Sequence, residues 1–343
     1  MPARFRHRAP RTRAGLRLAP VEARLTGSVG QPARNRHLQE NPMAAIFLRW
    51  QRTRRHDMFG LSKSDSTEKG HRQPGPFGAY TLHELINSGG MADVWLATDV
   101  QNQTCAVRCL HSDQFFDFTT RKRFLNGCLV LSRMPRCELV IGYREHGKID
   151  GSLYCALDYV EGANVKLLMA DSDPVLEEYV GNILIDMAAA LEHVHENGYM
   201  HLDFKPENVM VTRNGSVRLV DFDLALPRPS EPKKLSKNPG TPAYMSPEQL
   251  LREPVDHRAD IFAFGVTAYE LLTFRKPFAA DTADEVLRQQ LDRSIEFQAP
   301  RDLNPEIPPV VEKIILKCLE RDPDKRYPFT SVLLFDLQSA LYV

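Results

Sequence analysis

The sequence HLDFKPEN at residues 201–208, followed by DFD at residues 221–223, decides how this chain is interpreted. The two stretches hold polar groups at the spacing that phosphoryl transfer needs: a carboxylate to accept a hydroxyl proton, a cation for the transferred phosphoryl group, and two oxygen ligands for Mg²⁺. In that order these groups are Asp203, Lys205, Asn208 and Asp221. An isolated Asp-x-Lys would be read more simply as a surface turn, so the flanking sequence has to support the interpretation.

The flanking sequence places these groups on a loop between regular elements. Apolar residues recur every three or four positions over residues 180–194, which predicts an amphipathic helix that Gly198 can close. Residues 209–220 alternate around an Asn-Gly turn and predict a β-hairpin. We expect this hairpin to return Asp221 to the side of Asp203.

From about Tyr80 to the C-terminus the chain resembles the eukaryotic-type protein kinases, in the serine/threonine branch found in bacteria. Besides the two stretches above, the resemblance rests on INSGGMADV at 86–94, GTPAYMSPE at 240–248, DIFAFG at 260–265 and RDPDKR at 321–326. It implies an α+β, two-lobed protein kinase fold. A small, mainly antiparallel β N-lobe with one helix is expected at residues 79–160, and a larger, mainly helical C-lobe at residues 161–343.

The resemblance also implies a nucleotide site for ATP with Mg²⁺ or Mn²⁺. A Gly-rich turn lets backbone N–H groups approach phosphates, although Gly-Gly alone would also suit a plain hairpin turn. In this site the turn is Ser88, Gly89 and Gly90; Val94 and Ala106 cover the adenine, Met210 lies beneath it, Leu157 is the gatekeeper, and Asp158 to Val160 form the hinge. The turn departs from the family pattern at Asn87 and Ala92, where two glycines are usual.

The chain departs most from the family at a conserved ion pair of the nucleotide site. Arg108 stands where the family has a phosphate-binding Lys, and Gly127 stands where the partner Glu belongs. Arg is a wide planar fork and does not simply replace a compact ammonium. Without its carboxylate, Arg108 could pair with Asp221 and block the metal site. Misplacing one such donor would cost about 3–4 kcal/mol, roughly 10²–10³ in rate.

If the chain works as a kinase, restoring both members of that pair should raise its activity. The required changes are Arg108→Lys and Gly127→Glu. No gain from the double change would indicate that Arg108 is an adapted solution.

Two further departures concern regulation and the metal site. Leu202 replaces the Arg that receives an activation-loop phosphate, so activity should not depend on phosphorylation there. Asp223 replaces the Gly that lets the segment after Asp221 swing. Asp223 is interpreted either as an extra Mg²⁺ ligand or as a loop residue.

The substrate end of the domain keeps the family pattern. The resemblance places Thr241 within hydrogen-bonding reach of Asp203 and Lys205, and Lys205 favours Ser/Thr over Tyr acceptors. Asp260 is expected to hold the backbone of the catalytic loop from inside the lobe. The resemblance also implies a structural ion pair between Glu248 and Arg326.

The formal charge of zero conceals a division of the chain. Residues 1–57 hold thirteen Arg, no Lys and three acidic residues, so the remainder carries about −10. An Arg-rich arm without hydrophobic periodicity is expected to be disordered. It could bind nucleic acid or an anionic membrane, or be a transit peptide, but we favour upstream sequence ahead of a later start at Met43 or Met58.

The remaining features predict a cytoplasmic protein. Residues 58–78 are rich in Ser, Lys, Gly and Pro and are interpreted as a linker. No apolar run approaches the ~18 residues that a membrane helix needs. The six Cys residues include no C-x-x-C pair and are expected to be reduced core thiols.

Three functions of different classes remain open from sequence alone. The first is a serine/threonine kinase, of reduced activity, acting on protein substrates. The second is an ATP-binding pseudokinase that regulates a partner protein through its conformation. The third is a scaffold that binds no nucleotide. A role in binding nucleic acid is not expected.

Overall fold

The computed structural model describes residues 72–111, 117–235, 240–278, 280–292 and 297–342. The Arg-rich arm predicted at residues 1–57 lies outside these residues, as does most of the predicted linker. The last residues of that linker form a strand, β1 (Gly75–Phe77), which pairs with the next strand and so belongs to the sheet.

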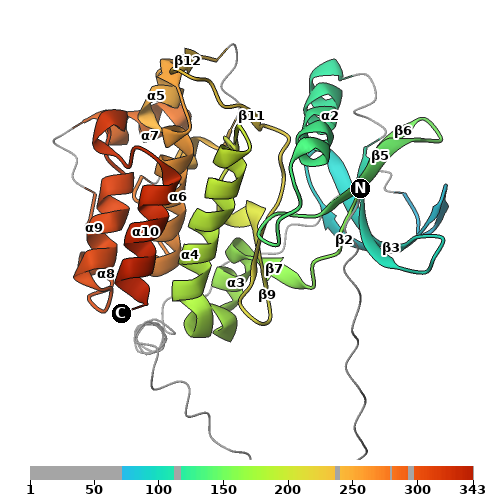
Figure 1. Ribbon diagram of the computed structural model, residues 1–343, viewed down its shortest axis with the longest axis horizontal. Helices are drawn as coiled ribbons and strands as arrows, with labels where there is room; N and C mark the ends of the chain where they lie inside the picture. The colour runs from blue at the N-terminus through green and yellow to red at the C-terminus, as the bar shows by residue number, and fades with distance from the viewer. Residues whose placement is uncertain (1–71, 112–116, 236–239, 279, 293–296, 343) are drawn as a thin grey trace, which may run out of the picture. The chain divides into compact units, whose positions relative to one another are not determined.

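Within the described residues, a six-stranded antiparallel sheet forms the N-lobe, in the order β1-β2-β3-β4-β6-β5 (Figure 1). The other strands are β2 (Tyr80–Ser88), β3 (Ala92–Thr98), β4 (Thr104–Leu110), β5 (Tyr143–Ile149) and β6 (Ser152–Leu157). Alternate side chains such as Trp95, Ala97 and Val107 build a small core with Phe77 on one face. The opposite face of the sheet is thereby left for a helix.

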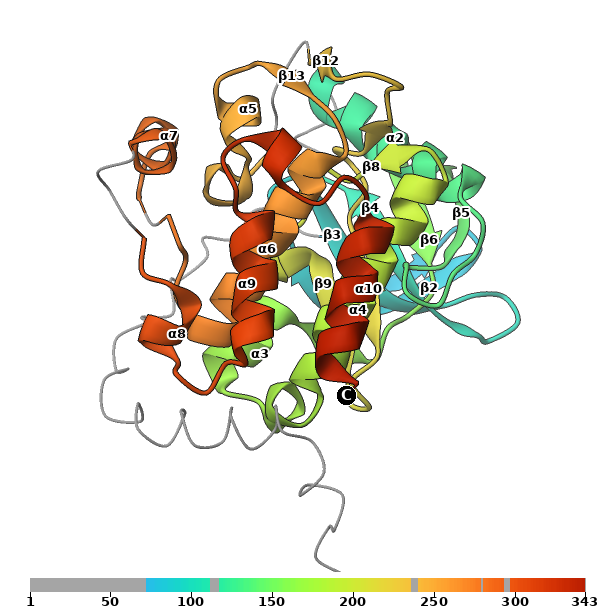
Figure 2. The same ribbon diagram turned by 60° about the vertical axis from the view of Figure 1, so that its left-hand side comes forward.

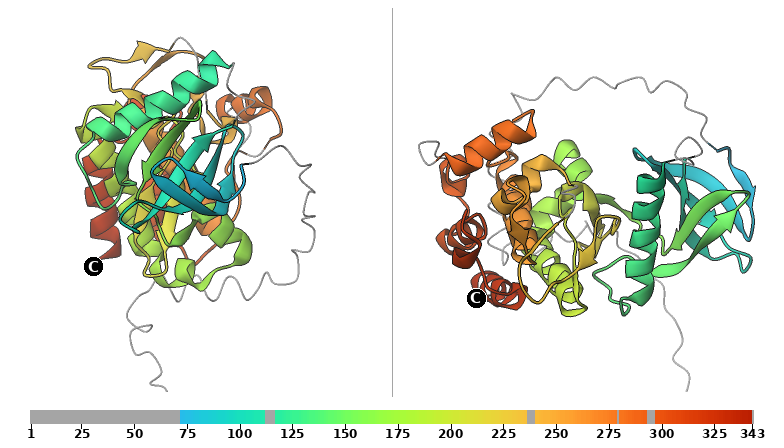
Figure 3. Two further views of the ribbon diagram at one scale, coloured as in Figure 1. Left: turned by 90° about the vertical axis from the view of Figure 1, so that its right-hand side faces the viewer. Right: turned by 90° about the horizontal axis from the view of Figure 1, so that it is seen from above.

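That helix is α2 (Phe118–Arg133), which runs along the sheet in Figure 3. Its first turn is capped by Asp117, whose side chain accepts a hydrogen bond from the N–H of Thr119 at 2.8 Å. Phe124 and Cys128 pack on the sheet beside Cys155. The N-lobe therefore has one helix in its described residues, as expected.

The C-lobe is built mainly of helices. Its helices are α3 (Val165–Asp171), α4 (Pro174–Glu196), α5 (Pro247–Leu250), α6 (Arg258–Thr273), α7 (Ala283–Leu291), α8 (Pro300–Leu303), α9 (Pro309–Cys318) and α10 (Thr330–Leu341). Of these, α6, α9, α4 and α10 lie side by side in Figure 2. Every residue of α6 except Arg258 is buried, so this helix is the centre of the lobe. The α+β, two-lobed architecture that the resemblance implies is confirmed.

Short elements between the helices carry the motifs. They are β7 (Gly162–Asn164), β8 (Tyr199–Met200), η3 (Pro206–Asn208), β9 (Val209–Thr212), β10 (Val217–Leu219), β11 (Leu226–Pro227), β12 (Lys233–Lys234), η4 (Pro242–Tyr244), β13 (Pro254–Val255) and η5 (Pro323–Lys325). The predicted helix is α4, and Gly198 follows it with a φ of +80°. The predicted hairpin is β9 with β10. The N–H of Val220 donates to the carbonyl of Asn208 at 2.9 Å, which brings the end of the hairpin back to the catalytic loop.

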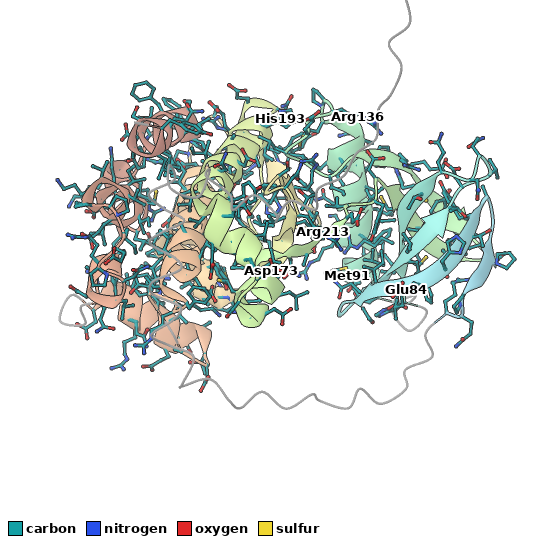
Figure 4. All side chains as sticks on the ribbon, turned by 90° about the horizontal axis from the view of Figure 1, so that it is seen from below. Glu84, Met91, Arg136, Asp173, His193 and Arg213 are labelled. Atoms are coloured by element: carbon teal, nitrogen blue, oxygen red, sulfur yellow. The ribbon has the colours of Figure 1, made fainter. Side chains whose placement is uncertain are left out.

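The two lobes are also joined through the segment that follows α2. The segment after α2 reaches α4, where Figure 4 shows Arg136 and His193. Nε2 of His193 donates to the carbonyl of Pro135 at 3.1 Å.

In the described part of the chain, no helix combines the length and apolar character needed to cross a bilayer.

The predicted ion pair between Glu248 and Arg326 is confirmed. Nη1 and Nη2 of Arg326 donate to Oε1 and Oε2 of Glu248 at 2.7 and 2.8 Å. The side chains are 0% and 6% exposed for Arg326 and Glu248. This pair joins α5 to the segment before α10.

We expect Arg326→Ala to lower the free energy of unfolding by about 3–5 kcal/mol, because it leaves the buried carboxylate of Glu248 without its counter-charge. Urea denaturation at pH 7 measures this change. Arg288→Ala is the matched control, since Arg288 is 63% exposed in its ion pair with Glu285 and should contribute nothing measurable. Equal effects of the two changes would contradict the prediction.

Candidate active site

The backbone of the catalytic loop is held by Asp260, a buried residue in the first turn of α6. Its carboxylate accepts hydrogen bonds from the N–H groups of His201 at 2.8 Å and Leu202 at 2.7 Å, and from Nε2 of His195 at 2.8 Å. Leu202 has a φ of +61°, a left-handed conformation that is costly for residues other than Gly. The bonds to Asp260 hold the loop in this conformation, as the sequence predicts.

Two effects oppose each other on the pKa of Asp260. Burial raises the pKa, but the hydrogen bond and charge of His195 and the bond from Leu202 lower it, and the result lies below the usual value. Asp260 is therefore ionised at neutral pH. Because its pKa is depressed on folding, its stabilising contribution is present above the unfolded-state pKa and is lost as pH falls through the folded-state value.

Three predicted polar residues, Lys205, Thr241 and Asn208, meet around Asp203. Nζ of Lys205 donates to Oδ2 of Asp203 at 2.8 Å and to Oγ1 of Thr241 at 2.9 Å. The hydroxyl of Thr241 donates to Oδ1 of Asp203 at 3.4 Å, and Nδ2 of Asn208 donates to the carbonyl of Asp203 at 2.8 Å. The hydrogen bonds predicted for Thr241 are thus present. Asp203 is 10% exposed, so its carboxylate is oriented but can still be reached.

The donor set at Asn208 and Asp221 suits Mg²⁺. The amide nitrogen of Asn208 is used in bonds to Asp203, which leaves the amide oxygen for a cation. The side chain of Asp221 is 37% exposed, and the backbone of this residue has a φ of +62°. No cluster of three His, Cys, Asp or Glu side chains suited to a metal occurs among the described residues. A cation here would therefore need substrate oxygens and water as further ligands, which is how Mg²⁺ is usually held.

The Gly-rich turn between β2 and β3 is a closed hairpin turn. The N–H of Gly89 donates to the carbonyl of Ala92 at 3.0 Å, and the hydroxyl of Ser88 donates to Oδ1 of Asp93 at 2.7 Å. A Cβ at Gly90 would meet nothing within 4 Å. The turn therefore leaves open space on one side, and its contact with phosphates stays a prediction.

The residues predicted to contact adenine come from both lobes. Ala106 pairs with Leu157, and Val94 pairs with Arg108, so these four share one face of the sheet. Met210 lies on β9, in the C-lobe. Its position beneath an adenine remains a prediction.

The hinge is anchored to the N-lobe. The N–H of Asp158 donates to the carbonyl of Gly142 at 2.7 Å, and Nε of Arg144 donates to Oδ1 of Asp158 at 2.8 Å. Val160 follows and is half-buried. The segment is thus fixed by its first residue.

Arg108 has a closer partner than the expected Asp221. Its Nη1 and Nη2 donate to Oδ1 and Oδ2 of Asp223, each at 2.7 Å. Oδ1 of Asp221 is 3.8 Å from Nη2, so the expected ion pair with Asp221 is present, as the longer of two contacts; the closer contact, with Asp223, was not expected. Both carboxylate oxygens of Asp223 are taken by Arg108.

The charges of this pair depend on opposing effects. Burial lowers the pKa of Arg108, but Asp223 and Asp221 more than offset it and the pKa is raised. Burial and Asp221 raise the pKa of Asp223, whereas Arg108 lowers it. Two parallel contacts of 2.7 Å are the geometry of a charged guanidinium–carboxylate fork, and we assign an ion pair on that ground.

Sequence reasoning did not find Asp223 as the partner of Arg108. The two residues are 115 positions apart, and each was considered as a separate departure from the family pattern. The sequence signal was their combination: a carboxylate is missing at Gly127 and an extra one is present at Asp223.

Leu202 lies in an apolar cluster on the other side of the loop. It is 5% exposed and packs with Met200, Val255 and Ala259, with Leu226 against them. The place where the family has an Arg is thus filled by hydrophobic contact with β11 and β13.

Comparison with known proteins gives a consistent result. Residues 80–336 match the protein kinase domain family. The chain is 34% identical over 272 residues to a probable serine/threonine-protein kinase of Streptomyces coelicolor, covering 77% of this chain and 40% of that relative. It is 30% identical over 265 residues to the serine/threonine-protein kinase PrkC of Bacillus subtilis, covering 77% and 40%. It is 29% identical over 267 residues to the serine/threonine-protein kinase PknH of Mycobacterium tuberculosis, covering 77% and 42%. The chain thus spans about two fifths of the length of these curated relatives.

Removing the Asp260 carboxylate should destabilise the protein at neutral pH. We expect Asp260→Ala to lower the free energy of unfolding by about 3–5 kcal/mol, because three buried donors lose their acceptor. Urea denaturation at pH 7 measures the change, with the exposed Asp281→Ala as control. An equal loss in both variants would contradict the assigned role.

Proposed function

Since this chain belongs to the protein kinase domain family, with bacterial serine/threonine kinases among its relatives, we propose that it transfers the γ-phosphate of ATP to Ser and Thr hydroxyls of proteins. The observation that carries the proposal is the hydrogen-bonded group of Asp203, Lys205, Thr241 and Asn208. Lys205 and Thr241 bond to the side chain of Asp203, whereas Asp260 bonds to the backbone of the loop. The arrangement around Asp203 supports a working site.

The proposed mechanism assigns one task to each group. Asp203 orients the acceptor hydroxyl and takes its proton as the new oxygen–phosphorus bond forms; the bond from the γ-phosphorus to the bridging oxygen of ATP breaks, and ADP leaves. Lys205, held by Asp203 and Thr241, neutralises charge on the transferred phosphoryl group. Asn208 and Asp221 would hold Mg²⁺, which when bound neutralises charge on the phosphate oxygens. Arg108 supplies the cation that the family's Lys otherwise provides.

The position of Leu202 supports activity without phosphorylation of the activation segment. Where the family places an Arg to receive a phosphate, this chain has an apolar contact with Val255 and Leu226. The segment that begins at Asp221 is also held through pairing of β11 with β8. We propose that these contacts replace the phosphate as the ordering interaction.

One observation favours a second function, an ATP-binding pseudokinase that regulates a partner protein. Both terminal nitrogens of Arg108 are engaged by Asp223. If this contact keeps Arg108 from the nucleotide phosphates, ATP would bind without efficient transfer. The same assay distinguishes the two functions.

The test uses the full chain with ATP labelled at the γ-phosphate, Mg²⁺ or Mn²⁺, and a generic basic protein acceptor. We expect label on Ser and Thr, and a loss of about 10²–10⁴-fold in Asp203→Asn, because its general base is removed. Asp221→Ala should abolish metal-dependent transfer. Asp281→Asn, on the exposed surface, is the matched control.

Two results would reject the kinase proposal. Transfer that persists unchanged in Asp203→Asn would mean that another group, or a contaminating enzyme, carries the activity. ATP binding that depends on Mg²⁺ and on Asp221, without any transfer by the unaltered chain, would identify the pseudokinase instead.

A further inference from the structure

The ion pair between Arg108 and Asp223 is a contact that the family pattern does not include. It joins β4 of the N-lobe to the segment that begins at Asp221. The side chains are 17% and 3% exposed for Arg108 and Asp223, so the pair is largely shielded from water. Shielding strengthens the attraction and makes the loss of either member costly.

The helix α2 is shaped to admit this pair. Gly127 faces Asp223, although Gly is among the least favourable residues inside a helix. A Cβ added at Gly127 would overlap Oδ1 of Asp223 and lie 3.1 Å from its backbone nitrogen and 3.2 Å from the carbonyl carbon of Phe222. The carboxylate of Asp223 therefore occupies the space that a side chain at Gly127 would fill.

We propose that Asp223 is a positioning residue that holds Arg108 where it can meet the phosphates of ATP, in place of the carboxylate that α2 lacks at Gly127. This rests on the proposed function in that ATP is the ligand. The ion pair between Arg108 and Asp223 is here called the relocated pair, and Gly127 makes room for it. Where the family has the carboxylate on the helix, this chain has it on the segment after Asp221, and Arg108 and Gly127 fit that position.

The relocated pair gives a physical reason for Arg in place of Lys. A guanidinium offers a planar fork that matches both oxygens of Asp223, whereas an ammonium would bind as a point charge. Its Cζ also lies 5.2 Å from the centre of the Phe124 ring, which supports the cation from α2. Arg has five N–H donors, and the two bonds to Asp223 leave donors for phosphate oxygens.

The relocated pair also changes what α2 contributes. The helix provides no charge to the pair, and it contacts the same segment through Asn126, whose Nδ2 donates to the carbonyl of Ala225 at 2.8 Å. The position of Arg108 is set by the segment after Asp221 and not by a charge on the helix.

The pair of substitutions suggested by sequence alone is revised by this geometry. Arg108→Lys with Gly127→Glu would drive the new side chain into Asp223. Restoring the family arrangement requires Asp223→Gly as well, because this change removes the oxygen that a side chain at position 127 would overlap. The backbone nitrogen of residue 223 and the carbonyl carbon of Phe222 stay 3.1 and 3.2 Å from the new Cβ, so the segment must also shift slightly away from α2.

The test measures binding of two ligands to the full chain by calorimetry: an ATP analogue with nitrogen in the β–γ bridge, together with Mg²⁺, and adenosine. The single variants are Asp223→Asn, Asp223→Gly and Gly127→Glu. Each should weaken binding of the ATP analogue by about 10–100-fold, the usual effect of losing a positioning partner. Adenosine affinity should stay unchanged, because Arg108 acts on phosphates.

Rescue is the decisive result. The double variant Gly127→Glu with Asp223→Gly should bind the ATP analogue about tenfold more tightly than Gly127→Glu alone, because the carboxylate is returned on the other element. Losses that multiply in the double variant would overturn the proposal. So would equal losses for adenosine, or unchanged binding of the ATP analogue by Asp223→Asn.

Two controls keep the outcome interpretable. Asp324→Asn changes a carboxylate whose side chain is 83% exposed and should leave both affinities as they are. Thermal unfolding monitored by circular dichroism shows which variants fold. If Gly127→Glu does not fold, the two Asp223 variants decide alone, and unchanged binding of the ATP analogue in both overturns the proposal.

The transfer assay separates this inference from the proposed function. A chain that binds the ATP analogue in the expected pattern but transfers no phosphate would retain the relocated pair and reject the kinase. A chain that transfers phosphate equally well in all three single variants would retain the kinase and reject the relocated pair.

Discussion

The carboxylate of Asp260 fixes the backbone of the loop that carries Asp203, Lys205 and Asn208. It lies in the first turn of α6, the most deeply buried helix, and accepts hydrogen bonds from His195, His201 and Leu202. These bonds hold Leu202 in a left-handed conformation that an isolated loop would avoid. The positions of Asp203 and the residues after it follow from that backbone, so the arrangement of the loop depends on a residue buried inside the lobe.

A second carboxylate, Asp223, holds Arg108 at the proposed nucleotide site. Asp223 holds Arg108 by a two-pronged contact, and α2 makes room for it with Gly127. Arg108, Asp223 and Gly127 would each weaken a kinase if considered alone. Together they are mutually consistent, because the charge lost from the helix is supplied by the neighbouring segment and a planar cation suits the new direction of approach. The altered pair is thus an ordered contact in the protein interior.

Much of the fold followed from short-range patterns. The periodicity of α4 and the Asn-Gly turn between β9 and β10 predict these elements directly, since each is specified within a few residues. The ion pair between Glu248 and Arg326 followed from the family resemblance and is present. The partner of Arg108 could not be predicted in this way. Arg108, Gly127 and Asp223 lie on three separate elements, and choosing between Asp221 and Asp223 requires their distances.

By itself, the sequence determined the kinase family, the order of the elements and the identity of the polar groups around Asp203, because these depend on local spacing and on motifs in a fixed order. Only the tertiary structure decided which carboxylate binds Arg108 and why α2 carries Gly127. The physical reason is that an ion pair depends on distance and burial in three dimensions. Residues 115 positions apart acquire both only when β4, α2 and the segment after Asp221 pack together.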